Sequence, residues 1–190
     1  MRPAVQEMAR QSAGPCPTIE TQRLVLRPHR LGDADAIAQS LGDFEVVRML
    51  TRVHLPYDRQ DALDWLAQAT SRRSQDWHLA ITMDGETHLG VVSLEHRHGQ
   101  WHLGYWLNHG TWGKGVMSEA VGATIDRFRQ SLPETTIHSG VFADNPASLR
   151  IQEKHGFQIM RTSTIFSRAR NAMAPHIETA LPSGTRINEN

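Results

Sequence analysis

The sequence predicts one α+β domain with a mixed, mostly antiparallel sheet of about seven strands flanked by helices. Its 190 residues suit a single domain with its own core. Two turn signals, at Asp84-Gly85 and at Gly99, join three strand-like segments in succession. A strand, a glycine-bearing loop and a helix then follow between Gly104 and Arg129, which indicates one strand–helix–strand crossover.

Composition excludes several classes of function. Twenty basic and twenty acidic residues balance, so the chain lacks the electrostatic footprint of a nucleic-acid binder or a protein of anionic membranes. The single Cys16, between two prolines, excludes an intrachain disulfide, fits a reducing compartment and is interpreted as incidental. With no apolar signal-peptide region and no long apolar run, the protein is predicted to be soluble and cytoplasmic.

Three segments are predicted. Residues 1–17 are polar and punctuated by proline, which is typical of a disordered N-terminal extension. Residues 18–182 contain the periodic segments and form the domain, and residues 183–190 are expected to be a flexible tail.

The first half of the domain is expected to hold one strand and three helices. Residues 21–27 alternate apolar and polar side chains and end at Pro28, which predicts a half-buried strand. Helices are predicted over residues 33–41, capped by Asp33, and over 44–50. A longer helix is predicted from Asp58 to about residue 73.

The remaining sheet strands are predicted at residues 77–83, 88–95, 101–107, 135–142, 157–166 and 176–181. A helix between the fourth and fifth of these begins at Asn145, with Pro146 at its first position, and ends at Gly156.

The loop before the central helix is a candidate anion site. Gly110, Gly113 and Gly115 let backbone N–H groups converge, and the first N–H groups of a helix lack internal partners, so phosphate is the expected guest. An ordinary tight turn before a core helix is the alternative. A nucleoside-triphosphate loop is excluded, because Lys114 is followed by glycine instead of serine or threonine.

Four separated motifs carry a resemblance to a known family. They are Thr21-Gln22-Arg23-Leu24-Val25-Leu26-Arg27-Pro28, Gly104-Tyr105-Trp106-Leu107, Trp112-Gly113-Lys114-Gly115-Val116-Met117-Ser118-Glu119-Ala120, and Asn145-Pro146-Ala147-Ser148-Leu149-Arg150 with Glu153-Lys154-His155-Gly156-Phe157. In this order they resemble the GNAT superfamily of acyl-CoA-dependent N-acetyltransferases, and more narrowly its RimJ/RimL type, the ribosomal-protein N-terminal acetyltransferases.

The resemblance implies acetyl-CoA as co-substrate and no metal. The cofactor is expected in a cleft where the strand ending at Leu107 splays away from the strand at residues 137–141. The implied cofactor contacts are Leu107 by main chain, Trp112, Gly113, Lys114, Gly115, Val116, Met117, Ser118, Asn145 and Ser148. Gly110 stands where the superfamily loop usually begins with Gln or Arg, so one side-chain contact is missing.

Four side chains are catalytic candidates. Relatives often carry Glu where this chain has His102, whose imidazole fits a water-mediated general base as well as it fits an exposed strand histidine. Glu95 is the reserve base. Ser148 is the candidate proton donor to the leaving thiolate and Tyr105 the alternative donor. Glu119, beside the expected phosphate, is interpreted as structural.

The predicted function is transfer of an acetyl group from acetyl-CoA to a primary amine by direct attack. The amine, whether a protein N-terminus or a small molecule, is left open, as is the choice between monomer and homodimer. A non-catalytic acyl-CoA-binding or regulatory module with the same fold is the alternative, and a pure protein-interaction domain is a third possibility. His96 and His98 are interpreted as hairpin residues and not as metal ligands.

Overall fold

The computed structural model describes residues 12–71 and 75–184, which form one eight-stranded sheet in the order β1-β2-β3-β4-β5-β6-β8-β7. The strands are β1 (Ile19–Glu20), β2 (Val25–Pro28), β3 (Trp77–Thr82), β4 (Gly90–Arg97), β5 (Gln100–Leu107), β6 (Ile137–Phe142), β7 (Gln158–Ser167) and β8 (Ala172–Leu181). All neighbours are antiparallel except β5 and β6. The α+β prediction is confirmed, and the strand beyond the predicted seven is the two-residue β1.

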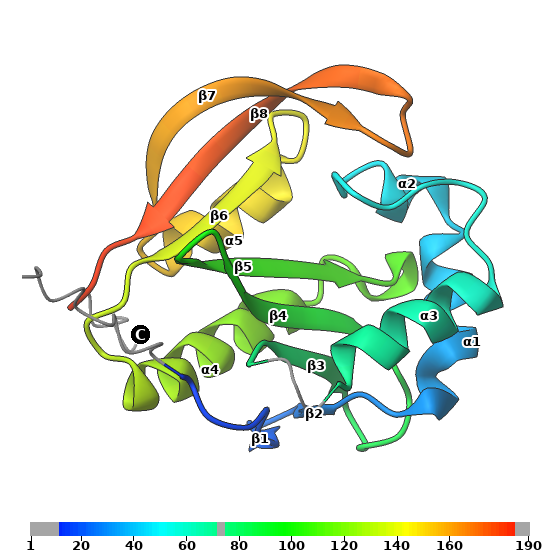
Figure 1. Cartoon of the computed structure of the whole chain (residues 1–190), viewed down its shortest axis with the longest axis horizontal. Helices are drawn as coiled ribbons and strands as arrows, with labels where there is room; N and C mark the ends of the chain where they lie inside the picture. Colours follow the sequence, from blue (N-terminus) through cyan, green and yellow to red (C-terminus); the bar gives the residue numbers. More distant parts are fainter. Residues whose placement is uncertain (1–11, 72–74, 185–190) are drawn as a thin grey trace, which may run out of the picture.

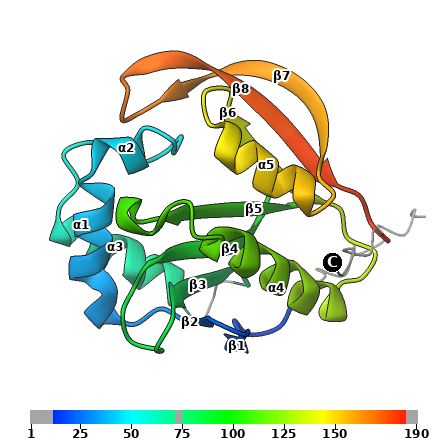
Figure 2. The same ribbon diagram turned by 180° about the vertical axis from the view of Figure 1, so that it is seen from behind.

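Helices cover both faces of the sheet. They are α1 (Ala34–Leu41), α2 (Phe44–Val47), α3 (Arg59–Ala69), α4 (Val116–Ser131) and α5 (Pro146–Lys154), with short 3₁₀ helices η1 (Leu31–Asp33) and η2 (His109–Thr111). Helix α3 lies in front of the sheet in Figure 1, whereas α4 and α5 lie on the opposite face, toward the viewer in Figure 2. The β7–β8 hairpin arches over β6 and α5.

Two clusters of buried side chains form the core. The larger lies between the sheet and α4, where the rings of Trp77 and Trp101 each meet Phe128 edge-on. The smaller joins α1 to α3 through side chains such as Ile37 and Leu66, both fully buried. Along α4 the buried side chains Met117, Val121, Thr124, Ile125 and Phe128 recur every three or four residues, as one face of a helix requires.

Several predicted boundaries need correction. Thr21 to Leu24 is a turn and not part of the first strand, since the Thr21 N–H donates to the Leu24 carbonyl. The extension predicted to be disordered through residue 17 is packed from Ala13 onward: Ala13 is buried, and the Trp77 indole N–H donates to the Gly14 carbonyl at 3.0 Å. Residues 1–11 of that extension, and 185–190 of the predicted tail, lie outside the described residues.

A buried ion pair joins β2 to the start of α1. The Arg27 guanidinium contacts both carboxylate oxygens of Asp33, at 2.8 and 3.0 Å, and both side chains are almost fully buried. Burial alone would raise the pKa of Asp33, but hydrogen bonds with His29 and Arg27 outweigh it and hold that pKa well below its usual range. The predicted N-cap role of Asp33 at α1 is wrong in one respect, because its side chain makes no cap bond there.

Two buried histidines lie beside this pair. The rings of His29 and His88 are 5.5 Å apart, and neither nitrogen of His88 has a hydrogen-bond partner. Burial lowers the pKa of His88 to about 4. The folded state therefore binds fewer protons than the unfolded chain, in which histidine titrates near 6.5.

This difference predicts a loss of stability in acid. The contribution of His88 is intact above pH 6.5 and is lost as the pH falls toward 4, by about 2 kcal/mol at pH 5. His88→Phe keeps the ring shape and removes the titration, so urea unfolding at pH 7.5 and pH 5 should show a smaller acid loss in the variant. Equal losses in both proteins would contradict the assignment to His88.

Candidate functional site

The site begins where β5 and β6 part. Their parallel ladder holds only two residue pairs, Trp101 with Ile137 and His102 with His138. Beyond His102 the strands diverge, as the splayed-strand prediction requires, and β6 continues its pairing with β8 instead. Main-chain N–H and C=O groups of β5 that would pair with β6 in a continuous sheet therefore face an opening between the two strands.

A cleft of about 1340 Å³ occupies this opening and extends between β5, α3 and α5. Every sequence-predicted site residue except Lys114 lines it. On the cofactor side these are Leu107, Trp112, Gly113, Gly115, Val116, Met117, Ser118, Asn145 and Ser148, and the catalytic candidates are Glu95, His102, Tyr105 and Ser148. The glycine loop and the candidate catalytic side chains thus meet in one place.

The loop before α4 uses two of its three glycines for conformation. Gly113 and Gly115 have φ values of 74° and 75°, a left-handed region that side chains rarely adopt. Gly115 is the N-cap of α4, so the strained turn delivers the chain directly into the first helical N–H groups. Gly110 differs from the prediction: it lies in η2 without a positive φ, and a Cβ there would meet nothing within 4 Å.

A brace from the turn before β2 holds this loop. The Arg23 guanidinium pairs with Glu119 at 2.7 Å and donates to the Lys114 carbonyl at 3.2 Å, and the Thr21 hydroxyl donates to Glu119 at 2.6 Å. The structural interpretation of Glu119 agrees with these contacts, because Arg23 offsets its negative charge in the first turn of α4. The Lys114 ammonium points elsewhere and donates to the Gly110 carbonyl at 2.8 Å.

The Trp112 side chain hydrogen-bonds to main chain that the resemblance assigned to the cofactor. Its indole N–H donates to the Leu107 carbonyl at 2.8 Å, and the ring lies against His109 with centroids 4.5 Å apart. A ligand contacting the main chain of Leu107 would therefore use the N–H group or share the carbonyl with the indole.

Tyr105 and Ser148 form a hydroxyl pair across the opening. The two oxygens are 2.7 Å apart, and the tyrosine O–H also lies 3.1 Å from the Ser148 carbonyl. Burial raises the pKa of Tyr105, so the phenol stays protonated throughout the neutral range. Asn145, as predicted, caps α5 by accepting from the Ser148 N–H at 3.1 Å.

His102 and Glu95 are register partners on β5 and β4. Burial, Arg97 and His138 lower the pKa of His102, which leaves its imidazole neutral at pH 7. Glu95 is a weaker base: burial would raise its pKa, but Arg97 lowers it, and Arg52 adds a second ion pair at 3.4 Å. The two candidate bases thus differ in their charged neighbours: Glu95 forms ion pairs with Arg97 and Arg52, whereas Arg97 and His138 lower the pKa of His102.

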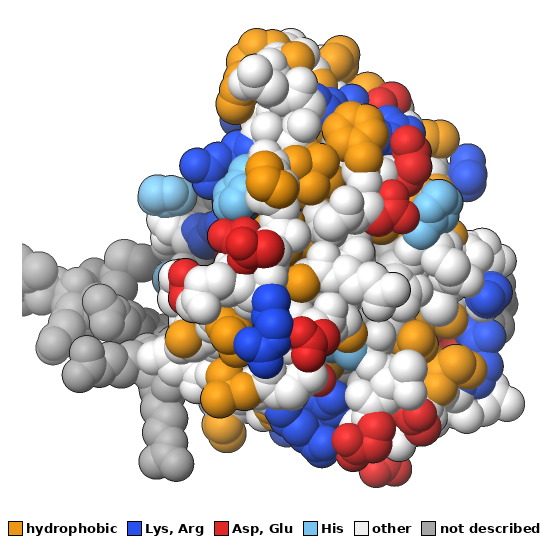
Figure 3. Space-filling view, turned by 90° about the vertical axis from the view of Figure 1, so that its right-hand side faces the viewer, with side chains coloured by type: hydrophobic (Ala, Val, Ile, Leu, Met, Phe, Trp, Pro, Cys, Tyr) orange, Lys and Arg blue, Asp and Glu red, His pale blue; other side chains and the backbone are white. Residues whose placement is uncertain are grey.

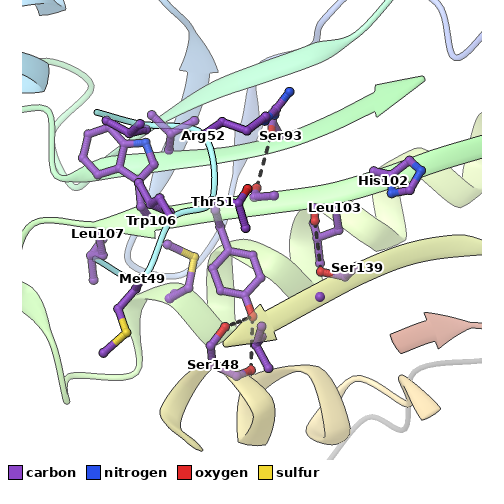
Figure 4. Close-up of a pocket in the computed structure, with 18 of the residues that line it drawn as sticks. Met49, Thr51, Arg52, Ser93, His102, Leu103, Trp106, Leu107, Ser139 and Ser148 are labelled. Atoms are coloured by element: carbon purple, nitrogen blue, oxygen red, sulfur yellow. Dashed lines mark hydrogen bonds between the residues drawn. The ribbon is translucent and has the colours of Figure 1, made fainter. Parts of the chain in front are cut away.

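A strap borders the cleft beside α3. It consists of residues 48–54, between α2 and α3, and six of its seven residues, Met49 to His54, line the cleft. The tip of the β7–β8 hairpin holds it, since Arg170 binds both oxygens of Asp144 at 2.9 Å and donates to the Arg48 carbonyl at 2.7 Å. Figure 4 shows Met49 near Trp106 and Leu107, at the opposite end of β5 from His102, and the Arg52 side chain extending toward Ser93.

A buried polar network closes the narrow end of the opening. The Ser139 hydroxyl donates to the Leu103 carbonyl at 3.0 Å and accepts from the Gln152 amide at 2.9 Å. The carbonyl oxygen of that amide accepts from the Thr179 hydroxyl at 2.6 Å. Figure 4 shows Leu103 and Ser139 facing each other across the gap.

The described residues carry few signs of other chemistry. Among them no group of three His, Cys, Asp or Glu side chains is arranged to hold a metal ion, and no helix is long and apolar enough to cross a bilayer. His96 and His98 are exposed at the β4–β5 hairpin. Figure 3 shows basic and acidic side chains intermixed on one face, with hydrophobic groups toward the β7–β8 hairpin at the top.

Sequence reasoning missed the residues that act across long separations. The Arg23–Glu119 brace, the Arg170–Asp144 contact and the Gln152 network are the main ones. Only Gln152 had a local signal, namely a polar residue one turn after Ser148 on the buried face of α5.

Comparison with known proteins places the chain in a family. A family model described as acetyltransferase (GNAT) domain matches residues 23–158. The uncharacterized N-acetyltransferase p20 of Bacillus licheniformis is 27% identical over 146 residues, which cover 74% of this chain and 82% of that protein.

Two solved structures share the fold. Ribosomal-protein-S5-alanine acetyltransferase from Vibrio fischeri superposes with a TM-score of 0.75 at 19% identity, over 91% of this chain and all of that one. Mycobacterium smegmatis RimJ in complex with CoA-disulfide gives 0.70 at 19% identity, over 84% and 81% of the chains. Because the family model covers most of the sequence, this chain belongs to the GNAT family and is an acyl-CoA-dependent acetyltransferase.

Proposed function

We propose that this protein transfers the acetyl group of acetyl-CoA directly to a primary amine, as enzymes of the RimJ/RimL type do. One observation carries the proposal: the N-terminus of α4, with its two left-handed glycines, and the Tyr105–Ser148 hydroxyl pair line the same cleft. The pyrophosphate would lie on the first N–H groups of α4, and the pantetheine arm would run along the open edge of β5. Mycobacterium smegmatis RimJ, which shares the fold, is a complex with CoA-disulfide, and this supports CoA as the ligand.

The reaction needs a proton acceptor, an electrophile and a proton donor. The amine nitrogen, once deprotonated, attacks the thioester carbonyl and forms the new C–N bond; the tetrahedral intermediate then expels the CoA thiolate as the C–S bond breaks. The hydroxyl of Tyr105 would return a proton to that thiolate, and the Ser148 hydroxyl, 2.7 Å away, would orient the phenol. Asn145 would hold Ser148 in place through the first turn of α5.

Direct attack is favoured because the one cysteine of the chain does not face the cleft. The single cysteine, Cys16, is partly buried outside the cleft, and burial raises its pKa to about 11. Its thiol lies 3.6 Å from the His78 carbonyl. A thiol of this kind stays protonated at neutral pH and forms no acyl-enzyme.

The cleft is lined by charges of both signs, five basic side chains and five acidic ones. Arg150 and Lys154, one turn apart on α5, lie on the side of the cofactor loop, where they would face phosphates. Asp61 and Asp64 of α3 line the opposite side, beneath the strap. We infer an amine acceptor, either a protein N-terminus or a small amine, that enters past α3, where Asp61 and Asp64 would attract an ammonium group, and loses its proton at His102.

Cofactor binding tests the anion site. Calorimetry should show tight binding of acetyl-CoA and at least tenfold weaker binding of a pantetheine thioester that lacks the pyrophosphate. Gly115→Ala forces a side chain into a left-handed position that costs about 1–2 kcal/mol, so it should weaken acetyl-CoA binding roughly tenfold.

Gly110→Ala is the matched control, since that residue has no positive φ and open space at its Cβ. It should bind acetyl-CoA like the wild type. Equal effects of the two substitutions would mean that the left-handed turn does not shape the anion site.

The proton donor is tested by removing one hydroxyl at a time. Tyr105→Phe should lower kcat by about 100-fold, the usual contribution of a general acid, while KM for acetyl-CoA stays within about twofold. Ser148→Ala should lower kcat less, because the phenol would still reach the thiolate. A Tyr105→Phe enzyme with unchanged kcat would exclude Tyr105 as the donor, and binding without any turnover in the wild type would favour a non-catalytic module.

The base is tested by the pH dependence of kcat/KM. In the wild type the rate should fall as the pH drops through the lowered pKa of His102, where the imidazole becomes protonated. His102→Ala should lose about 100-fold at pH 7.5 and lose that acid limb, whereas Glu95→Gln should keep it. The reverse pattern would assign the base to Glu95.

A further inference from the structure

The narrow end of the opening is built from polar side chains in a place where the rest of the core is apolar. Gln152 is 1% exposed and Thr179 is 2% exposed. The side-chain amide of Gln152 is hydrogen-bonded through both its NH₂ group and its carbonyl oxygen. The donors follow one direction, from Thr179 to Gln152, then to Ser139, then to the Leu103 carbonyl. This chain links β8, α5, β6 and β5, in that order.

Its position coincides with the end of the β5–β6 ladder. The last main-chain pair is His102 with His138, and the next residues on the two strands are Leu103 and Ser139. There the Ser139 hydroxyl takes over the bond to the Leu103 carbonyl that a continuing sheet would have made with a main-chain N–H. The gap between the strands therefore begins at Leu103 and Ser139. Gln152 fixes this point through its hydrogen bond to Ser139.

Helix α5 contacts both sides of the gap. Ser148 and Gln152 are one turn apart and share a face of the helix. Ser148 and Gln152 both reach the Tyr105 hydroxyl on β5, and Gln152 also reaches Ser139 on β6 and Thr179 on β8. Because both ends of this face are hydrogen-bonded, the separation of the strands is set by side chains of one rigid helix.

The acyl end of the cofactor would lie at this narrow end. The loop between β5 and α4, residues 108–115, follows Leu107 directly. Leu103 lies four residues before Leu107 on β5, a distance of about 13 Å along the strand. A pantetheine arm that starts at the loop and follows β5 therefore brings its thioester toward Leu103 and Tyr105. We propose that Gln152 is a positioning residue that fixes the width of the gap at the thioester and thereby restricts the acyl group to a short one.

This inference rests on the proposed function, and binding of acyl-CoA thioesters tests it without knowledge of the acceptor. Calorimetry would compare acetyl-CoA with butyryl-CoA, and the wild type should prefer acetyl-CoA by at least tenfold, since two extra methylenes in a fitted site cost about tenfold or more. Gln152→Leu keeps the volume and removes both hydrogen bonds. It should reduce the preference to about twofold, because the tie between Ser139 and the helix is lost.

Two further variants keep the test decisive. Ser139→Ala removes the bond to Leu103 with a smaller change to the core and should reduce the preference in the same direction, even if Gln152→Leu folds poorly. Thr82→Val is the stability control: its buried hydroxyl also bonds one donor and one acceptor, but far from the cleft. It should lower Tm and leave the preference at the wild-type value.

The outcomes separate the two proposals. An unchanged preference in both Gln152→Leu and Ser139→Ala, or a wild type that binds both thioesters equally, would overturn the positioning role while the acetyltransferase proposal stands. A wild type that binds no acyl-CoA would overturn both.

Discussion

Main-chain pairing between β5 and β6 stops after His102 and His138, and the other parts of the site follow from that interruption. A strand edge inside a protein carries N–H and C=O groups that must find partners. At the two ends of the open segment other side chains are these partners. The Ser139 hydroxyl donates to the Leu103 carbonyl, and the Trp112 indole N–H donates to the Leu107 carbonyl. Tyr105 lies midway between these two, where an extended ligand can pair with the strand as a further strand would.

Ion pairs and hydrogen bonds hold two segments that border the opening, the loop before α4 and the strap. The N-terminus of α4 offers unpaired N–H groups for an anion, and the Arg23–Glu119 pair holds its loop from outside the cleft. On the other side the strap is held by Arg170, whose guanidinium also lies over the Phe142 ring at 4.5 Å. Exposed contacts of this kind contribute little stability singly, but together they fix the position of a segment that has little regular structure.

Local signals in the sequence predicted most of the fold and the glycine loop that lines the cleft. The glycines of the loop, the Asn145-Pro146 helix start and the hairpin turn at Asp84-Gly85 each act within a few residues, so their pattern is visible in the chain. The rest depends on pairs such as Arg23 with Glu119, 96 residues apart, and Gln152 with Thr179, 27 residues apart. Periodicity carries no information about such pairs, and a buried amide breaks the apolar pattern that marks a core position.

Helix α5 shows why such polar residues are worth their cost in the core. Besides the Gln152 bonds, its end residue His155 is buried and lies 2.8 Å from the Ser118 carbonyl, in the first turn of α4. The ring packs so closely on α4 that a Cβ at Gly122 would come within 2.9 Å of it. Apolar contacts alone would let the helix slide or rotate with little penalty, whereas directional bonds to β5, β6, β8 and α4 allow one placement. The width of the opening and the position of the first turn of α4 are therefore set by the same element.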